Sequence, residues 1–481
     1  MTSTSTPERL QRNLRRIHEL LEKQRVVEQL VTRQRAPRKE LAESLVHRQH
    51  LVELQIHLSR LHSADLAHLL ETVALDQRLM LWKQIDSQRG GEVLLNMRDE
   101  AREGLIQALP HSELEDVLQQ LSADDLTVIA DDVPDQVLQQ RLKELTADDR
   151  HWFQTAVSYP EDTVGHLMTH EMATALEEAT QTETVVAMRR LKPFPAHTDK
   201  LFVIDQRGRF KGIVTMQALL LAEPGMRVRD IMVTRVVSFQ AEDPARDAAS
   251  AFDRYELVSA PVLSDRGSLI GRLTVDRVVD YRRESTTDDV LSIAGLSGRE
   301  DPYGSVWQSA RNRWLWLFIN LATAFFASRV IGAFEGVIAE LVALAALMPI
   351  VASIGGNTGN QTAALVIRSL AQGPLTRTTF KQFIRKELGI SLINGAVFGV
   401  VVGLFALVFY RQPALAGVIA TAVLFNLVIA AVVGLLAPTT LERYGRDPAL
   451  GSSIILTATT DIMGFMVFLS LAGAFLVRGG G

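Results

Sequence analysis

The chain of 481 residues contains no cysteine. Disulfides and thiolate metal sites are therefore excluded, because both need a cysteine sulfur. The first residues, MTSTSTPERLQRNLRRIHELLEKQR, lack the apolar core of a secretory signal, so we expect the soluble part to stay in the cytosol. The chain also lacks a nucleophile–base motif and a phosphate-binding loop, so the sequence does not predict an enzyme.

Charged residues are scarce after residue 314, whereas residues 1–310 have the patterning of a soluble protein. Several apolar segments reach the roughly 20 residues that a membrane-spanning helix needs. We place five of them near 314–334, 340–367, 387–409, 414–437 and 449–477. The sequence therefore predicts an all-α transmembrane domain of five helices at 314–481.

Basic residues are distributed unevenly among the connections of these segments. They gather before the first segment, between the second and third, and between the fourth and fifth. The positive-inside rule then places the N-terminus and the soluble domains in the cytoplasm and the C-terminus outside. An odd number of spans agrees with this orientation.

One carboxylate interrupts the last apolar segment. Asp461 lies near the middle of ALGSSIILTATTDIMGFMVFLSLAGAFLV, which has no other charge. A carboxylate at the centre of a membrane helix costs about 2.5–3.5 kcal/mol on insertion scales, so such residues are usually functional. We interpret Asp461 as a cation site on a water-filled path, with packing between helices as the alternative. Thr457 and Gly464 make its surroundings polar and open, and we predict that both line the path.

The second apolar segment is unusually polar for a membrane helix. It reads MPIVASIGGNTGNQTAALVIRSL from Met348, and Ser353, Asn357 and Gln361 recur every four residues. Side chains at this spacing share one face of a helix. We predict that this polar stripe lines a hydrophilic pore together with Gly356.

Proline and glycine also mark the apolar segments. Pro349 is expected to bend or break the second helix. Gly355 and Gly359 are spaced to let another helix come close. The third segment repeats this spacing at Gly395, Gly399 and Gly403, which we interpret as tight helix packing.

Residues 164–283 contain an internal repeat. LFVIDQRGRFKGIVTMQALL in the first copy matches APVLSDRGSLIGRLTVDRVV in the second, and each copy has a polar turn at Gly208 or Gly267. Strands that alternate with helices indicate an α/β unit. The repeat resembles a tandem CBS pair, most specifically in the pattern D-x-x-G-x-x-x-G-x-x-T from Asp205 to Thr215. The resemblance implies a unit at 161–283 that binds ATP or another adenosyl nucleotide, or that serves as a regulatory dimerisation unit.

The remaining soluble segments have simpler patterns. Residues 41–160 predict an α-helical N domain whose SADDL and TADDR sequences look like helix N-caps with acidic first turns. Residues 1–40 predict a basic amphipathic arm. Residues 284–313 connect the repeat to the first apolar segment, and we expect a helix there that starts near Thr287.

From about residue 45 to 477 the chain resembles the MgtE family of magnesium transporters. The resemblance rests on MPIVASIGGNTGNQTAALVIRSLA, RKELGISLINGAVFG and GRDPALGSSIILTATTDIMGF, in that order. It implies a homodimer in the bacterial inner (plasma) membrane, with two copies of Asp461 around a permeant Mg²⁺ ion and no nucleic-acid partner. Regulatory Mg²⁺ in the cytosol would bind between the soluble domains and lock the connecting (plug) helices over the pore.

The same resemblance points to residues of the magnesium sensor. The matching positions carry acidic side chains, as the chemistry of Mg²⁺ requires. They are Glu242, Glu256, Asp280, Asp288 and Asp289, with Asp124 and Asp125 of the N domain as further partners. Arg277 stands where the family often has an acid, which puts one sensor site in doubt.

Three functions remain open from the sequence. The first is a Mg²⁺ channel gated by cytosolic Mg²⁺. The second is a coupled secondary transporter of Mg²⁺, Co²⁺ or Mn²⁺, which would need a proton or sodium site. The membrane part offers no second interior acid for it, since the other candidates lie near segment ends: Glu335, Glu340, Glu387 and Glu442. The third is a membrane sensor that transports nothing, against which the polar stripe argues.

Overall fold

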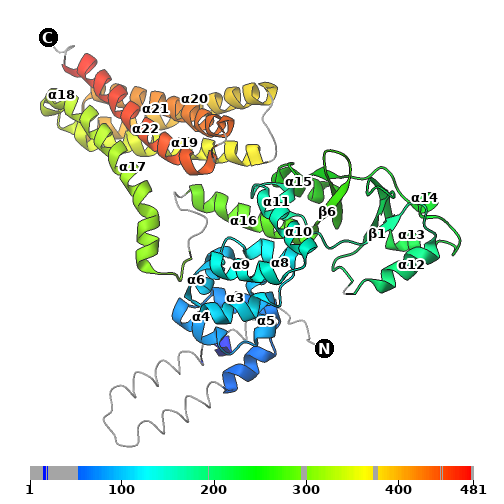
Figure 1. The fold of residues 1–481 in the computed structure, drawn as a ribbon. Coiled ribbons are helices and arrows are strands. Elements are labelled where there is room, and N and C mark those ends of the chain that lie inside the picture. The colour runs from blue at the N-terminus through cyan, green and yellow to red at the C-terminus, as the bar shows by residue number, and fades with distance from the viewer. Residues whose placement is uncertain are drawn as a thin grey trace, which may run out of the picture. The chain divides into compact units, whose positions relative to one another are not determined.

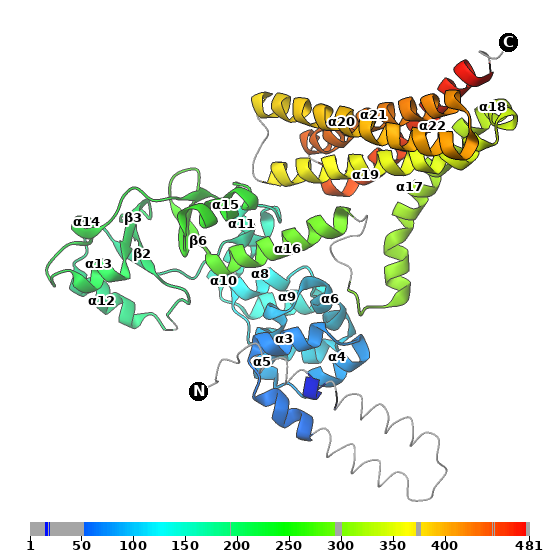
Figure 2. The same cartoon turned by 180° about the vertical axis from the view of Figure 1, so that it is seen from behind.

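The computed structural model describes residues 15–17, 19, 52–192, 194–293, 301–371, 377–444, 446 and 448–477. The chain divides into two compact units, drawn as a ribbon in Figure 1 and from behind in Figure 2. The first unit comprises Met1–Arg282 and Arg299–Val306, and the second comprises Arg283–Gly298 and Trp307–Gly481. The predicted arm at 1–40 falls almost wholly outside the described residues.

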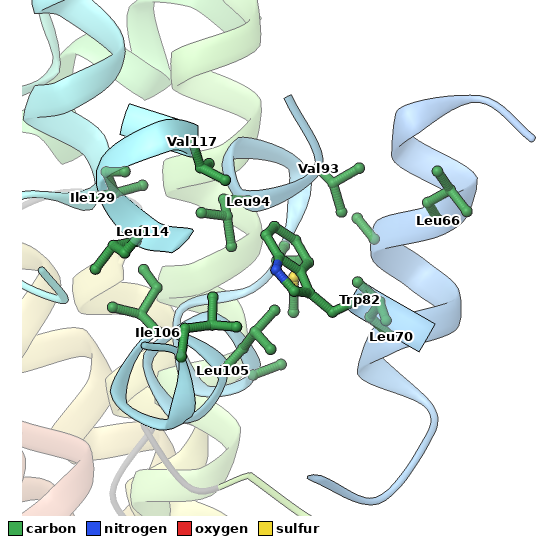
Figure 3. Close-up of a cluster of buried hydrophobic side chains, with 14 of the residues drawn as sticks. Leu66, Leu70, Trp82, Val93, Leu94, Leu105, Ile106, Leu114, Val117 and Ile129 are labelled. Carbon is green, nitrogen blue, oxygen red and sulfur yellow. The ribbon is translucent and has the colours of Figure 1, made fainter. Parts of the chain in front are cut away.

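Short helices form the N-terminal part of the first unit, as the sequence predicts. They are α3 (Ser63–Glu71), α4 (Leu75–Trp82), α5 (Ser87–Asn96), α6 (Asp99–Ala108), α7 (His111–Leu118), α8 (Ala123–Ile129), α9 (Asp135–Glu144) and α10 (Ala147–Ser158). The hydroxyls of Ser122 and Thr146 accept hydrogen bonds from the first turns of α8 and α10, which confirms the predicted N-caps. The apolar faces bury one shared core, in which Leu70, Trp82 and Leu105 meet from different helices (Figure 3).

A buried arginine joins this helical domain to a distant segment of its own unit. Arg78 is fully buried, and its guanidinium donates to the backbone oxygens of Leu70 (2.9 Å) and Ala101 (2.8 Å). It also donates to the carboxylate of Asp301 at 3.0 Å. The carboxylate supplies the negative charge that a buried guanidinium needs. Residues 301–306 therefore belong to the soluble unit, although the first apolar helix follows them directly.

The two α/β repeats consist of strands and helices, as the sequence predicts, and each begins with a short helix. The first contains α11 (Val164–Leu167), β1 (Thr174–Leu176), α12 (Gln181–Arg190), β2 (Lys200–Ile204), β3 (Phe210–Thr215) and α13 (Met216–Leu221). The second contains α14 (Val228–Ile231), β4 (Phe239–Gln240), α15 (Ala245–Tyr255), β5 (Ser259–Leu263) and β6 (Leu269–Thr274). In each three-stranded sheet the first two strands are parallel and the last two antiparallel. Gly208 and Gly267 turn the antiparallel pairs at φ of 75° and 74°, where other residues are strained.

The helix after β6 is longer than the sequence predicts. α16 (Val275–Ile293) is one continuous helix, so no separate connecting helix begins near Thr287. The Thr287 hydroxyl donates to the backbone oxygen of Arg283, one turn earlier in the same helix. The stretch VDRVVDYRRESTTDDVLSI has neither proline nor glycine, which explains why the helix continues. The chain passes from the first unit to the second within α16.

The second unit is built mainly from long helices. They are α17 (Val306–Ala333), α18 (Glu335–Glu340), α19 (Ala343–Ala371), α20 (Arg377–Tyr410), α21 (Pro413–Arg443) and α22 (Pro448–Ala472), followed by a π-helical turn η1 (Gly473–Val477). Within the described residues, four segments are long and apolar enough to cross a membrane: Ser309–Ala333, Arg377–Tyr410, Pro413–Arg443 and Gly451–Leu476. α19 is long enough, but the amides of Asn357, Asn360 and Gln361 lower its mean hydropathy.

Proline does not break the second membrane helix. Pro349 lies inside α19, which runs on without interruption for a further 22 residues. A proline removes one backbone hydrogen bond. The helix on both sides of it is fixed by buried Leu347 and Val351, which pack into the apolar core of this unit. The predicted break is therefore wrong, because tertiary packing outweighs one lost hydrogen bond.

Glycines bring α20 and α21 into close contact. A β-carbon placed on Gly395 would lie 3.0 Å from the α-carbon of Leu424, and one on Gly399 would lie 2.7 Å from the backbone oxygen of Ala420. Gly403 approaches the backbone oxygen of Ala416 in the same way. This geometry confirms the interpretation of the third segment as tight helix packing.

We predict that Gly399→Ala destabilises the protein. The added methyl group would clash with the backbone of α21, and overpacking of this kind costs about 1–3 kcal/mol. Gly389→Ala is the matched control, because a β-carbon there meets no atom within 4 Å. Thermal unfolding of the purified full chain in detergent should show a lower melting temperature for the Gly399 variant alone. Equal melting of the two variants would contradict the close contact.

Candidate functional site

Asp461 is the one charged residue of α22. Its side chain is half-buried, and the neighbouring Thr460 is fully buried with its hydroxyl donating to the backbone oxygen of Thr457 at 3.2 Å. A β-carbon on Gly356 of α19 would lie 3.9 Å from the Thr460 hydroxyl oxygen. The polar part of α19 therefore runs beside the turn of α22 that carries Asp461.

The predicted polar stripe lies on one side of α19. Ser353, Asn357 and Gln361 are all exposed on the second unit, and Gly356 is half-buried. Gly355 and Gly359 point the other way and are buried against α21 and α22. Amide and hydroxyl side chains exposed on an apolar helix need water or another protein surface beside them at membrane depth. The stripe is therefore arranged as the wall of a hydrophilic path.

A buried asparagine holds the neighbouring helices together, and the sequence analysis did not find it. Asn426 of α21 is fully buried, and its amide donates to the backbone oxygen of Val351 in α19 at 2.8 Å. Gly355 and Gly464 leave the space that its side chain fills. Gly464, which the sequence predicted to line the path, is thus buried against Asn426. Thr457 is exposed one turn before Asp461, where it can face the path.

Glu387 is enclosed within the second unit, although the sequence places it near a segment end. α20 begins at Arg377, ten residues before Glu387, so the helix continues well beyond the predicted segment. The side chain of Glu387 is buried, and one carboxylate oxygen accepts a hydrogen bond from the Thr362 hydroxyl at 2.8 Å. The membrane part therefore holds a second enclosed acid, contrary to the prediction.

Asp124 connects the helical domain to the first repeat. Its buried carboxylate accepts hydrogen bonds from the indole N–H of Trp152 (2.6 Å) and from the backbone N–H groups of His170 (2.9 Å) and Glu171 (3.0 Å). The guanidinium of Arg277, the base that departs from the family pattern, donates to the backbone oxygen of Asp124 at 3.2 Å. These contacts give Asp124 a structural role between α8, α10 and the loop before β1.

Asp125 caps α8 together with Ser122. Its carboxylate accepts from the Ser122 hydroxyl at 2.9 Å and from the Ser122 backbone N–H at 3.2 Å, which completes a capping box. This is the capping role that the SADDL pattern offers as the simpler explanation.

Acidic side chains gather around Glu171, which the sequence analysis also missed. Partial burial raises the pKa of Glu171, and the carboxylates of Asp124 and Asp125 raise it further, while Arg272 lowers it. Like charges held close together make the ionised form of each one less favourable. This acidic cluster is assembled from residues 46 positions apart, and no local motif marks it.

The other predicted sensor acids come from the second repeat and from α16. Glu242 is exposed, and after burial it is the largest cause of the raised pKa of Tyr159. Glu256 is exposed at the end of α15, in a left-handed conformation with φ of 50°. Asp280 and Asp288 are exposed on α16, and the side chain of Asp289 lies outside the described residues. In the described part of a single chain, no group of three or more acidic or histidine side chains converges on a metal site.

A helical domain, a paired α/β repeat and a bundle of apolar helices with an interior carboxylate together indicate a membrane transport protein. Family models match the chain as the MgtE intracellular N domain at 61–162, as CBS domains at 164–225 and 228–284, and as an MgtE divalent cation transporter at 348–471. The chain belongs to the MgtE family.

Two curated relatives are magnesium transporters named MgtE. The one from Thermus thermophilus is 30% identical over 427 residues, which cover 87% of this chain and 94% of the relative. The one from Bacillus subtilis is 27% identical over 75% of this chain and 80% of its own. A crystal structure titled as the cytosolic domain of the Mg²⁺ channel MgtE in complex with ATP covers 50% of this chain and 98% of its own, with 27% identity and a TM-score of 0.45.

We predict that Glu171→Gln stabilises the protein at neutral pH. A carboxyl with a raised pKa in the folded state contributes stability below its unfolded pKa, and this stability is lost as the pH rises through the folded pKa. Glutamine carries no charge, so the variant avoids that loss. The melting temperature should rise by no more than about 2 °C, because solvent screens a partly exposed group.

Melting curves across a pH series provide the check. The gain of the Glu171 variant should disappear as the pH falls below 4.5, the ordinary pKa of a glutamate. Glu223→Gln is the control, since Glu223 is exposed and outside the acidic cluster. A gain that is independent of pH would show that charge repulsion is not its cause.

Proposed function

We propose that this protein is a magnesium-selective channel of the bacterial inner membrane, gated by cytosolic Mg²⁺ that binds among the acidic soluble domains. The observation that carries the proposal is the placement of Asp461, half-buried in an otherwise uncharged helix beside the exposed polar side of α19. The names of the relatives, magnesium transporters, support the choice of ion.

The chemistry of this site suits a hydrated ion. Mg²⁺ gives up its water reluctantly and usually binds through one or two carboxylates while keeping several waters. Asp461 supplies the charge, and the amides of Asn357 and Gln361 supply donors and acceptors for water in the hydration shell. We infer that the ion passes with its waters and is attracted by charge, not held in a dry cage of ligands.

The path needs a second copy of the chain. On one chain the polar stripe of α19 is exposed and Asp461 is only half-buried, so a single copy would present these polar groups to lipid. The first span, Ser309–Ala333, is almost entirely exposed on a single chain, with 6% of its most apolar part buried. Its surface is therefore available to lipid or to a partner. A symmetric dimer would bring two Asp461 carboxylates to one axis. We therefore propose a homodimer with the N-terminus and soluble domains in the cytoplasm and the C-terminus outside.

Electrostatic repulsion explains how the soluble domains would sense magnesium. Neighbouring carboxylates raise the pKa of Glu171, and a group of like charges of this kind gains free energy when a divalent cation binds between them. We propose that Glu242, Glu256, Asp280, Asp288 and Asp289 act in this way between domains or between copies. α16 carries three of these acids and passes into the second unit, so it is suited to serve as the plug helix.

The CBS pair is proposed to bind ATP or another adenosyl nucleotide as a second regulatory ligand, because the family model assigns two CBS domains. A coupled secondary transporter is the alternative function. The enclosed acid Glu387 is the observation that favours it, since coupling needs an ionisable site besides Asp461.

We predict that Asp461→Asn abolishes magnesium uptake. The side chain keeps its shape but loses its charge, and a charge-assisted contact of about 3 kcal/mol corresponds to about a hundredfold loss. Uptake of Mg²⁺ into proteoliposomes is the measurement. Glu442→Gln is the control because Glu442 is an exposed acid near the end of α21. Normal uptake by the Asp461 variant would exclude it as the ion site.

We also predict that Glu256→Gln, Asp280→Asn and Asp289→Asn together leave the channel open at high cytosolic Mg²⁺. Without these charges, Mg²⁺ binds the closed state no more tightly than the open state. A ligand with equal affinity for two states does not shift the equilibrium between them. Flux should then continue when magnesium on the cytosolic side is raised, whereas flux through the unmodified protein stops.

Protease protection provides a second measurement of the same change. Magnesium should protect the soluble domains of the unmodified protein but not those of the triple variant. The control neutralises three acids outside the predicted sensor: Asp116, Glu223 and Asp247. Equal closure and equal protection in all three proteins would show that the sensor lies elsewhere.

A further inference from the structure

Glu387 occupies a closed position among the membrane helices. Its side chain is 5% exposed and belongs to the buried side of α20, where residues follow at intervals of four. The next position is Ser391, and the series continues with the glycines that contact α21. One carboxylate oxygen accepts from Thr362, but the other, Oε1, has no hydrogen-bond partner in the described part of the chain.

Ser391, one turn further along α20, also has a buried polar atom without a hydrogen-bond partner among the described residues. This atom is its hydroxyl oxygen, and its side chain is 1% exposed. Residues four apart on a helix have β-carbons about 5–6 Å apart. Two orphaned polar groups, one an acid and the other a hydroxyl, therefore lie next to each other on one buried face. A buried polar group without a partner is destabilising, so both groups favour an added hydrogen-bond partner.

The surrounding helices offer no counter-charge. Opposite this part of α20, α21 presents the apolar side chains of LVIAAVVGLL, and α19 presents Thr362. The charged residues of α19, α21 and α22 and those beside Glu387 itself are Arg368, Glu442, Arg443, Asp461, Arg385 and Lys386. None forms an ion pair with Glu387 within the described ranges, and all but the half-buried Asp461 are exposed. An ionised carboxylate here would be a buried, unpaired charge.

The number of oxygens decides which ligand fits. Mg²⁺ and Ca²⁺ take about six to eight oxygen ligands. The side chains here supply four oxygens: two of Glu387, one of Thr362 and one of Ser391, with no second acid among them. A proton needs only one acceptor, and once bound it turns the carboxyl into a donor for a neighbouring hydroxyl. A proton therefore satisfies Oε1 of Glu387, and the resulting O–H can reach the Ser391 hydroxyl through a water, since no direct bond joins the two side chains in the described part of the chain.

We propose that Glu387 is a proton-binding site of the membrane unit, with Thr362 donating to the carboxyl and Ser391 accepting the bound proton's hydrogen bond through a water. The proton comes from water and returns to it, so no other reactant is required. Thr362 directly follows Gln361 of the polar stripe. Thr362 therefore links the proton-binding site to the wall of the proposed path. This site is separate from Asp461, and the inference does not depend on which cation the protein carries.

Infrared difference spectra of the purified full chain in lipid nanodiscs test the proposal. Spectra taken across a series from about pH 5 to 8 report the C=O stretch of protonated carboxyl groups. The wild type should show a protonated-carboxyl band that Glu387→Gln lacks. Glu442→Gln, which changes an exposed carboxyl of the same unit, should retain it. Ser391→Ala should keep the band but shift its frequency, because the hydroxyl that accepts the hydrogen bond is lost.

Melting temperatures over the same pH series give an independent readout. The linked proton counts of unfolding should differ between the wild type and the Glu387 variant. Identical bands and identical proton counts in the two proteins would overturn the proposal. A band that disappears when sodium replaces choline at constant pH and ionic strength would also overturn it, since sodium would then be the ligand. If the Glu387 variant does not fold, an unshifted band in Ser391→Ala contradicts the proposed contact.

Discussion

A carboxylate removed from water must be paired or hydrogen-bonded, and this constraint determines how the functional parts of the protein are built. Asp124 meets it with donors from an indole and two backbone amides. Asp461 meets it by staying half-exposed beside the polar stripe of α19. Among the described residues Glu387 has a single donor, the Thr362 hydroxyl, and its other carboxylate oxygen has no partner there. The three acids thus differ in how far the described residues satisfy them, which is the basis for proposing a cation site at Asp461 and a proton site at Glu387.

Glycine makes these polar positions possible inside an apolar bundle. Where α19, α21 and α22 approach one another, Gly355 and Gly464 leave room for the side chain of Asn426, which fixes α19 through its bond to Val351. The glycines of α20 bring its backbone against α21 in the same way. Close packing without large side chains places polar groups at defined depths, and their partners need not come from the same helix. In this unit the glycines therefore determine both the close packing of the helices and the positions of the polar side chains.

Features with a local origin could be predicted from the sequence. The apolar segments, the repeat with its glycine turns, the caps at Ser122 and Thr146 and the interior position of Asp461 follow from neighbouring residues alone. The errors arose where distant contacts decide. Pro349 does not break α19 because the flanking residues pack into a core. α20 begins ten residues before Glu387, so Glu387 lies inside the helix and not at its end. The donors to Asp124 come from residues far along the chain, and no sequence pattern predicts them.

The connections between the two units limit how a change in the soluble part can reach the membrane helices. One connection is α16, a continuous helix that passes from the first unit into the second without a flexible residue between Val275 and Ile293. The other is the segment before α17, which Asp301 fixes to the buried guanidinium of Arg78. A helix transmits displacement along its axis because its backbone bonds resist stretching. An ion pair with a buried partner resists separation because breaking it leaves a charge uncompensated. Within the described residues both connections are therefore stiff, which supports the proposal that a rearrangement of the acidic domains would be carried into α16 and α17.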